Sequence, residues 1–154
     1  MLLVLFKLEN DRYALDAGQI VEVLPFVSLK KVPQALPEVG GVLNYHGDLV
    51  PVIDLCKLVL GKPASPRLST RIILVKYRIK DKDRVLGLIA EQATGTIHRE
   101  IGDFVSSGLA VDEAAYLGPV INDSLGLIQV IDIAKLLPAR VRDVLFGLPV
   151  EQAQ

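Results

Sequence analysis

The sequence of 154 residues contains one cysteine, Cys56, and two histidines, His46 and His98. A single cysteine excludes an intrachain disulfide and is typical of a protein from a reducing cytoplasm. Because Cys56 falls in an apolar stretch, we interpret it as an inert core thiol and not as a nucleophile. The histidines lie far apart in the sequence and neither has a second ligand at helical spacing, so we expect no metal site.

Motifs that carry chemistry are also missing: the chain has no glycine-rich phosphate loop and no CxxC or HExxH spacing. Asp54 and Asp132 could form a carboxylate pair, but helix capping explains them more simply. Two catalytic arrangements stay open, a site built from His46, Asp48 and a distant carboxylate, and a Ser-His-Asp arrangement, which sequence order alone does not test. We therefore expect a protein that is not an enzyme and needs no cofactor.

The charge is nearly balanced, with a formal net charge of -1. A chain of this charge has no general attraction for nucleic acid or for anionic lipid. The apolar start, residues 1–6, is too short for a membrane span and lacks the basic region of a signal peptide, so we expect a cytoplasmic protein without direct membrane insertion. The length fits one domain or two small subdomains, and a hydrophobic content of 51% allows a substantial core.

The stretch 41–58 holds two apolar runs on either side of His46-Gly47-Asp48. Two such runs around a short break with glycine predict a β-hairpin, because glycine readily adopts the positive φ of a tight turn. Pro51 has no N–H to donate, so we expect it at a sheet edge or a bulge. Asp54 is placed to cap a short helix from Leu55 that ends at Gly61.

This stretch has a second copy: residues 42–58 align without gaps on residues 120–136, with eight of seventeen positions identical. The alternative is chance recurrence at two junctions between a strand and a helix, but the shared Asn and Lys favour a duplication. Residues 61–66, rich in Gly and Pro, then separate two halves, about 1–61 and 68–138. Residues 139–154 follow as a C-terminal helix and tail.

Several short strands in each half and little helical periodicity predict an all-β protein. We expect one small barrel from each half, and a barrel of this size is filled by its own side chains. After Pro138, apolar residues recur at helical spacing and predict a helix packed on the body, with a partner-binding amphipathic helix as the alternative. Residues 78–84 form a highly charged turn between two strand-like runs.

The sequence Asn44-Tyr45-His46-Gly47 followed by Val50-Pro51-Val52-Ile53-Asp54-Leu55 resembles the central signature of the CheW family, the coupling proteins of bacterial chemotaxis arrays. The resemblance extends from about Leu3 to Leu137. In the family's pattern Arg stands where this chain has His46. The resemblance implies one CheW-like domain made of two SH3-like, five-stranded barrels with a groove between them.

The resemblance further implies a non-catalytic adaptor. Its partners would be the cytoplasmic tip of a methyl-accepting chemotaxis receptor and the regulatory domain of the histidine kinase CheA, so that the protein would associate with membrane receptor arrays through protein contacts. The receptor-binding groove it implies contains Ile20, Glu22, Val23 and His46. The kinase-docking hairpin it implies contains Val42, Asn44, Gly47, Val50 and Pro51, although core packing explains Val42 and Val50 equally well.

Because His carries a charge only when protonated, we expect a weaker or pH-dependent pairing between His46 and Glu22 than an Arg would give. Three alternatives to the chemotaxis adaptor remain open. The chain could serve a related array that controls surface motility, biofilm formation or a pilus. It could dock on the kinase without binding receptors. The most remote alternative is a small β-barrel enzyme or ligand-binding protein.

Overall fold

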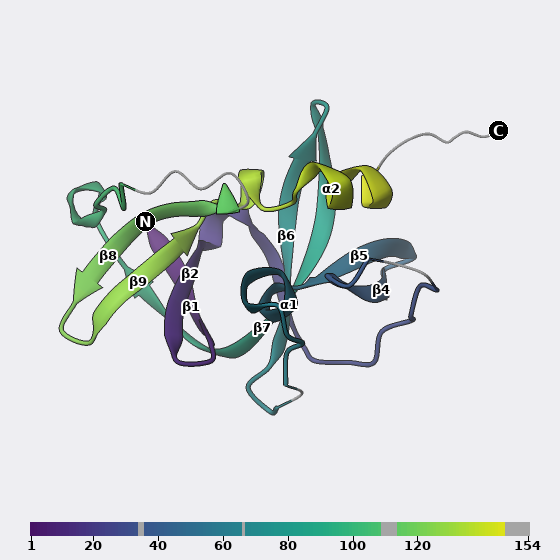
Figure 1. Cartoon of the computed structure of the whole chain (residues 1–154), viewed down its shortest axis with the longest axis horizontal. Coiled ribbons are helices and arrows are strands. Elements are labelled where there is room, and N and C mark those ends of the chain that lie inside the picture. The colour runs from purple at the N-terminus through teal and green to yellow at the C-terminus, as the bar shows by residue number, and fades with distance from the viewer. Residues whose placement is uncertain (34–35, 66, 109–113, 147–154) are drawn as a thin grey trace.

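The computed structural model describes residues 1–33, 36–65, 67–108 and 114–146. These residues form a predominantly β protein, as the sequence predicts (Figure 1). The strands are β1 (Leu2–Leu8), β2 (Asp11–Asp16), β3 (Ile20–Pro25), β4 (Val39–Tyr45), β5 (Asp48–Asp54), β6 (Arg71–Ile79), β7 (Lys82–His98), β8 (Leu117–Asp123) and β9 (Gly126–Ile131). The helices are α1 (Leu55–Leu60) and α2 (Ala139–Phe146), with 3-10 turns η1 (Ala17–Gln19), η2 (Ile101–Asp103) and η4 (Ile133–Lys135).

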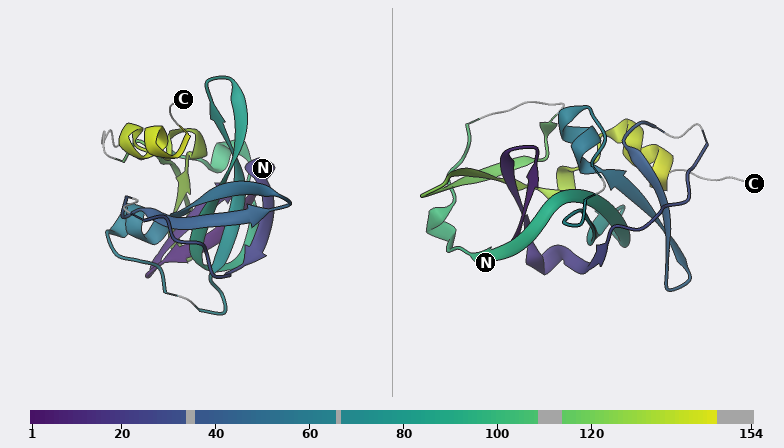
Figure 2. Two further views of the ribbon diagram at one scale, coloured as in Figure 1. Left: turned by 90° about the vertical axis from the view of Figure 1, so that its right-hand side faces the viewer. Right: turned by 90° about the horizontal axis from the view of Figure 1, so that it is seen from below.

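The long strand β7 belongs to both barrels. Its first part, residues 82–90, pairs with β6, and its second part, residues 91–98, pairs with β1. The first barrel therefore contains β8, β9, β2, β1 and the second part of β7, whereas the second barrel contains β3, β6, the first part of β7, β5 and β4. Figure 2 shows the two groups of strands side by side with β7 running from one to the other. The expected pair of small five-stranded barrels is confirmed.

The expectation that each half of the sequence builds its own barrel is wrong. The first half supplies β1 and β2 to the first barrel and β3, β4 and β5 to the second barrel. The physical reason is that the strands pair across the halves: β2 runs parallel to β9, and β5 runs parallel to β7. The order of elements still recurs in each half, with α1 after the β4–β5 hairpin and η4 after the β8–β9 hairpin.

Within the described residues, continuous strand pairing does not close either barrel, and one isolated bridge spans each seam. Lys30 and Val42 exchange backbone hydrogen bonds of 3.1 and 2.8 Å, and Val105 and Val120 exchange bonds of 2.9 and 2.8 Å. Val42 and Val120 are the aligned first positions of the repeat. Gly41 permits the approach at the second barrel, because its φ is +143° and a Cβ there would lie 2.7 Å from the Lys30 carbonyl oxygen.

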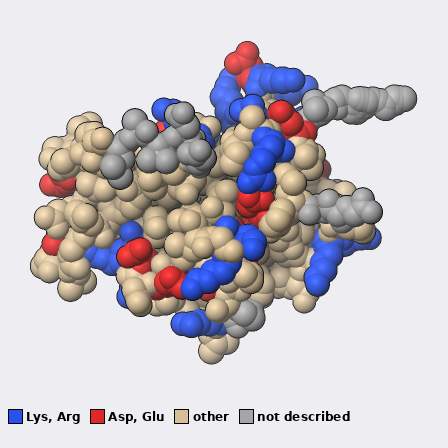
Figure 3. Space-filling view, in the orientation of Figure 1, with Lys and Arg blue, Asp and Glu red and all other residues tan. Residues whose placement is uncertain are grey.

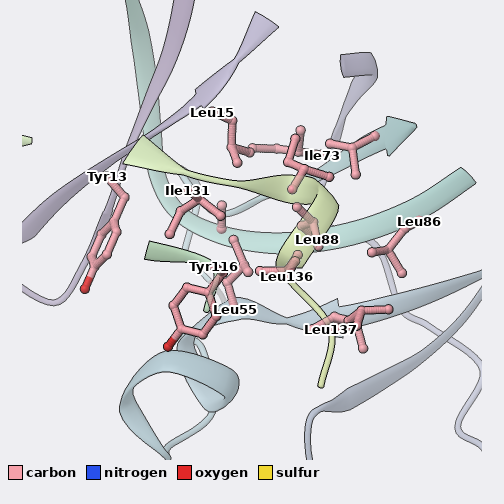
Figure 4. Close-up of a cluster of buried hydrophobic side chains, with 14 of the residues drawn as sticks. Tyr13, Leu15, Leu55, Ile73, Leu86, Leu88, Tyr116, Ile131, Leu136 and Leu137 are labelled. Carbon is pink, nitrogen blue, oxygen red and sulfur yellow. The ribbon is translucent and has the colours of Figure 1, made fainter. Parts of the chain in front are cut away.

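The main core lies between the barrels and joins them (Figure 4). Each barrel also has a small interior cluster. The interior residues of the first barrel are Leu3, Ala14, Ile121, Ile128 and Val130. Those of the second are Val50, Val52, Ile72, Leu74 and Ile89. Cys56 belongs to the main core, where it is 2% exposed and burial raises the pKa of its thiol to about 11, so its expected core position is confirmed.

The predicted helix caps are present. The Asp54 carboxylate accepts a hydrogen bond from the Lys57 N–H at 3.2 Å, and Gly61 ends α1 in the left-handed conformation with φ of 81°. Asp132 caps η4 in the same way, through the Ala134 N–H at 3.2 Å. These roles account for both aspartates without a catalytic pair.

The predicted C-terminal helix is α2, and it packs on the body. Val141 is fully buried, and the Phe146 ring stacks on Tyr77 with the ring centroids 5.8 Å apart. Arg140 donates two hydrogen bonds to the Glu38 carboxylate, just before β4, and this contact lowers the pKa of Glu38. The tail expected at 147–154 lies outside the described residues.

Candidate partner-binding surface

The β4–β5 hairpin ends in a tight turn that its sequence specifies. Tyr45 and Asp48 form the last pair of the ladder, and the two residues between them, His46 and Gly47, have φ of 52° and 90°. A two-residue turn with positive φ at both positions is the type I′ turn, which matches the twist of a hairpin. The Asn44 side chain accepts the Gly47 N–H at 2.9 Å. Asn44 and Gly47 therefore shape the turn, and the exposed His46 is held at its tip.

Glu22 on β3 reaches across the seam of the second barrel to this hairpin. The Tyr45 hydroxyl donates a hydrogen bond to the Glu22 carboxylate at 2.5 Å, and this contact raises the pKa of Tyr45. We expected Glu22 to pair with His46, but among the ion pairs of the described residues there is none between these two side chains. Tyr45 still belongs to strand β4, whereas His46 lies beyond it in the turn.

The residues expected at the receptor groove differ in exposure. Ile20 is half-buried and packs against the main core, whereas Glu22 and Val23 are exposed. A register shift between Ile20 and Glu22 interrupts the alternation of β3, so that three consecutive residues are exposed: Val21 at 40%, Glu22, and Val23 at 43%. Sequence reasoning missed this bulge because a run of apolar residues shows no period. The exposed apolar residues of this segment, which we name the β3 strip, are Val21, Val23, Phe26 and Val27.

The residues expected at the kinase-docking hairpin also divide into two kinds. Val50 is 2% exposed and belongs to the interior of the second barrel, so it does not offer a surface to a partner. Val42 and Pro51 are half-buried and pair with each other. The backbone N–H and C=O of Val42 both form hydrogen bonds with Lys30. Pro51, the partner of Val42 in the ladder, therefore loses no hydrogen bond to β4 through its missing N–H.

Pro51 lies at a local edge of the sheet, as we expected, because β5 has a paired strand on only one side at this position among the described residues. Strand β5 pairs with β4 on one side and, from Val52 onward, with β7 on the other side. The register shift of the hairpin lies elsewhere, between Val39 and Gly41. Pro51 stands one residue before the pairing with β7 begins, so its missing N–H interrupts no ladder hydrogen bond on that side.

An apolar groove of about 360 Å³ lies between the hairpin, the connector that precedes it and α2. Two of its residues are strongly exposed, Leu49 at 74% and Val144 at 62%. The groove, which we name the hairpin groove, is lined by Val32, Pro33, Val39, Val42, Leu49, Pro51, Val144 and Leu145. A hollow of about 480 Å³ adjoins it through Leu49 and Pro51 and extends to Tyr45 and His46. The sequence indicated the apolar face of α2 but not that this face meets the hairpin.

Chemically, the surface is suited to recognition by apolar contacts with a few polar groups at its margin. Within the described residues, His, Cys, Asp and Glu side chains do not gather in groups of three that could hold a metal ion. None of the helices that the structure describes is long and apolar enough to cross a membrane.

Comparisons with known proteins agree with one another. The family model described as CheW-like domain matches residues 2–141. Chemotaxis protein CheW of Bacillus subtilis is 26% identical over 137 residues, which cover 88% of this chain and 85% of that protein. Protein PilI of Pseudomonas aeruginosa is 32% identical over 117 residues, which cover 76% of this chain and 62% of PilI.

The fold also matches a solved structure. The crystal structure of scaffolding protein TtCheW from Thermoanaerobacter tengcongensis has a TM-score of 0.81 to this chain and 24% sequence identity. The match covers 94% of this chain and 92% of that chain. At this level of identity the likeness shows the fold.

Proposed function

This chain belongs to the CheW-like domain family, and from that premise we propose that it is a non-catalytic adaptor that couples methyl-accepting chemotaxis receptors to a CheA-type histidine kinase. The adaptor holds receptor and kinase in a fixed geometry, so that a shift in the receptor changes kinase activity. It acts in the cytoplasm, at receptor arrays, through protein contacts alone. The similarity to chemotaxis protein CheW of Bacillus subtilis supports this role.

The observation that carries the proposal is the apolar surface of the second barrel. The hairpin groove and the β3 strip are formed by β3, the β4–β5 hairpin, the connector between β3 and β4, and α2, and they present large apolar side chains to solvent. Contiguous exposed apolar surface on a soluble domain marks an interaction site. A rigid sheet that presents aliphatic anchors in a groove is suited to a protein partner.

We assign the two partners to neighbouring parts of this surface. The receptor tip binds at the β3 strip, with Glu22 and His46 at its polar margin, and Ile20 acts by packing. The kinase regulatory domain binds at the hairpin groove, where Val42, Leu49 and Pro51 are accessible. The Asn44–Gly47 hydrogen bond fixes the turn, and Val50 supports the hairpin from inside.

A second candidate is an adaptor of an array that controls a pilus. The observation that favours it is the 32% identity to Protein PilI, which exceeds the 26% identity to the Bacillus subtilis CheW. The physics of the adaptor is the same in both cases. Only the receptor and the kinase differ, so binding to partners from the two kinds of array separates the candidates.

The test is a pair of binding titrations, with a CheA regulatory domain and a receptor cytoplasmic fragment from the same genome. We expect saturable binding to both in the micromolar range of transient signalling contacts. Binding to the kinase alone would favour a kinase-docking component. Binding to neither would contradict the adaptor and lead back to a ligand-binding protein.

The repeat supplies a matched control for the kinase site. Leu49 and Leu127 are aligned positions of the two copies and are both strongly exposed, at 74% and 62%. Leu49→Ala should weaken kinase binding by about tenfold, the effect of truncating an apolar anchor, whereas Leu127→Ala should not. Equal effects of the two variants would move the kinase site away from the hairpin groove.

The receptor site is tested in the same way. Val23→Asp introduces a charge into the β3 strip, and Val105→Asp introduces the same charge at an exposed valine of the first barrel. Receptor binding should fall by about tenfold or more in Val23→Asp only, because a charge is desolvated at an apolar contact. Receptor binding that survives Val23→Asp would remove the β3 strip from the receptor site.

A further inference from the structure

The β6–β7 hairpin is longer than its counterpart in the other barrel. Val52 pairs with Gly87 and the aligned Val130 pairs with Ala14, so Gly87 and Ala14 are equivalent positions. Gly87 lies five positions after Lys82, the end of the β6–β7 ladder, whereas Ala14 lies three positions after Asp11, the end of the β1–β2 ladder. The β6–β7 hairpin therefore extends by two further residue pairs, and it projects from the body (Figure 1).

This extension concentrates positive charge in a chain whose net charge is -1. The residues from 76 to 84 that carry charge are Lys76, Arg78, Lys80, Lys82 and Arg84 against Asp81 and Asp83. All of them are exposed, and the basic side chains gather over the projecting end in Figure 3. Arg78 pairs with Asp83 at 3.2 Å, whereas Lys76, Lys80 and Lys82 take part in no ion pair within the described residues.

The two turn residues of the β6–β7 hairpin are charged, although glycine or asparagine would adopt their backbone conformation with less strain. Lys80 and Asp81 have φ of 47° and 65°. Turns with positive φ at both positions favour Asn and Gly, and lysine adopts this conformation rarely. Backbone strain of this kind clusters at functional sites in proteins.

A hollow of about 360 Å³ lies between α2 and the end of β6, and the turn residue Lys80 also lines it. The stacked rings of Tyr77 and Phe146 contribute apolar surface to it. Its basic residues are Arg78, Lys80 and Arg142, and the one acidic residue in its lining, Asp143, lies 3.6 Å from Arg142. The hollow is therefore basic and has an apolar wall.

We propose that the β6–β7 hairpin and this hollow bind an extended acidic segment of a partner protein. Lys76 and Arg78 are two positions apart on β6, about 7 Å, and Lys80 follows them in the turn. Carboxylates at alternate residues of an extended chain have the same spacing, and guanidinium and ammonium groups form charge-assisted hydrogen bonds with them. No residue of this surface belongs to the β3 strip or the hairpin groove, so the inference goes beyond the proposed function.

The probe is an oligo-glutamate peptide, titrated into the full chain and followed by the amide chemical shifts of the protein. Saturable shifts should appear at residues 76–84 and in α2, and binding should weaken as salt is added. The double variant Lys80→Gln, Lys82→Gln should raise the Kd by about fivefold, as expected for the loss of two exposed charge contacts. The matched control, Lys30→Gln with Lys31→Gln, removes the same charge from the exposed connector and should change the Kd by less than about twofold.

Three outcomes would overturn the proposal. The first is the absence of saturable binding. The second is an equal loss in the control variant, which would show attraction by net charge only. The third is a response of the hairpin to phosphatidylglycerol vesicles or to duplex DNA at concentrations where the peptide gives none. Kinase and receptor titrations of Lys80→Gln, Lys82→Gln should match those of the unmodified chain, which keeps this result separate from the adaptor test.

Discussion

At the scale of single residues, Gly41 and Gly47 are two of the glycines with positive φ, and their surroundings differ. Gly47 has φ of +90° and a Cβ there would meet no atom within 4 Å, whereas a Cβ on Gly41 would lie 2.7 Å from a backbone oxygen. Gly47→Ala should therefore lower the free energy of unfolding by about 1 kcal/mol, through backbone strain alone. Gly41→Ala should lower it by about 3 kcal/mol or more, because the clash between the connector and β4 adds to the strain.

Urea denaturation of the two variants checks this order, with Gly102→Ala as the control. Gly102 has no positive φ, and a Cβ there would also meet no atom within 4 Å. Its replacement should change the free energy of unfolding by less than about 0.5 kcal/mol. If Gly41→Ala and Gly47→Ala lowered the free energy of unfolding equally, the connector would be able to move away from β4 at little cost. The bridge between Val42 and Lys30 would then not determine the position of the connector.

Asp123 ties the β8–β9 turn to the β1–β2 hairpin. Arg12 donates to its carboxylate at 3.1 and 2.5 Å and to the Gly126 carbonyl at 3.1 Å. The Arg12 contact, followed by the Leu125 N–H, lowers the pKa of Asp123 from 3.8 to about 2. A carboxyl with a lowered pKa in the folded state stabilises the fold above its unfolded pKa, and this contribution is lost as the pH falls.

The contribution of the Arg12–Asp123 contact to stability should therefore depend on pH. Asp123→Asn should be less stable than the unmodified chain at neutral pH, and the difference should disappear between roughly pH 4 and pH 2. Urea midpoints across this range measure it. Asp48→Asn is the control, since Asp48 lies at the tip of the other hairpin and forms no ion pair among those described. A constant difference between Asp123→Asn and the unmodified chain at all these pH values would contradict the assignment.

At the scale of elements, the two aligned aspartates cap helices of different kinds. Asp54 accepts the Lys57 N–H at the start of α1 and also the Ala64 N–H at 2.9 Å, and it is 8% exposed. Asp132 accepts a single backbone N–H at the start of η4. Asp54→Ala should therefore lower the free energy of unfolding by about 2 kcal/mol, and Asp132→Ala by about 1 kcal/mol.

Thermal and urea unfolding of the two variants measure the difference, and the serine variants refine it. Serine retains one acceptor for the first turn of the helix, so Asp132→Ser should recover most of the loss. Asp54→Ser should recover only part, because the second bond, to Ala64, is not replaced. If Asp54→Ala and Asp132→Ala lower the free energy of unfolding by the same amount, the hydrogen bond from Ala64 to Asp54 contributes nothing to stability.

Elements that depend on local chemistry could be predicted from the sequence. The Gly47 turn, the cap at Asp54 and the end of α1 at Gly61 are all set by residues within a few positions. The exposure of the candidate site could not be predicted, because both hairpin strands are continuously apolar. Such a run does not show that Val50 points inward while Leu49 points outward.

The polar margin of the site escaped prediction for a different reason. The hydrogen bond between Tyr45 and Glu22 crosses the seam of a barrel, and seams are set by tertiary structure. The resemblance directed attention to His46, the position that departs from the family's pattern. The side chain that reaches Glu22 belongs to its neighbour, which the pattern leaves variable.

At the scale of the whole molecule, the exchange of strands between the halves could not be read from the order of elements. Two separate barrels and two barrels that exchange strands have the same order along the chain. Which of the two arrangements forms depends on which strands pair along their edges. In this chain β7 pairs with strands of both barrels, and this produces the exchange. Gln92, with φ of 46°, lies just after the point where β7 passes from the second barrel to the first.

The exchange predicts how the chain behaves when it is cut. Fragments 1–65 and 67–146 separate the two halves of the chain. Each fragment then lacks the strands of the other half with which its own strands pair. Fragment 1–65 retains the β1–β2 and β4–β5 hairpins but loses the partners of β3, and it also loses the continuous core between the barrels. A small fragment that buries so little apolar surface does not offset its conformational entropy. We expect each fragment alone to be unfolded.

Mixing the fragments should restore the fold as a one-to-one complex, because all the pairings between halves remain available. Amide dispersion in two-dimensional NMR spectra distinguishes the states: narrow for each fragment and close to that of the intact chain for the mixture. Separate barrels would give the opposite result: the amide signals of each fragment would be dispersed when it is alone and would not change on mixing.

A cut at residue 66 also leaves the β3 strip and most of the hairpin groove on the first fragment, whereas α2 remains on the second. Binding of the kinase should therefore return only with the complex, because Val144 and Leu145 of α2 complete the groove.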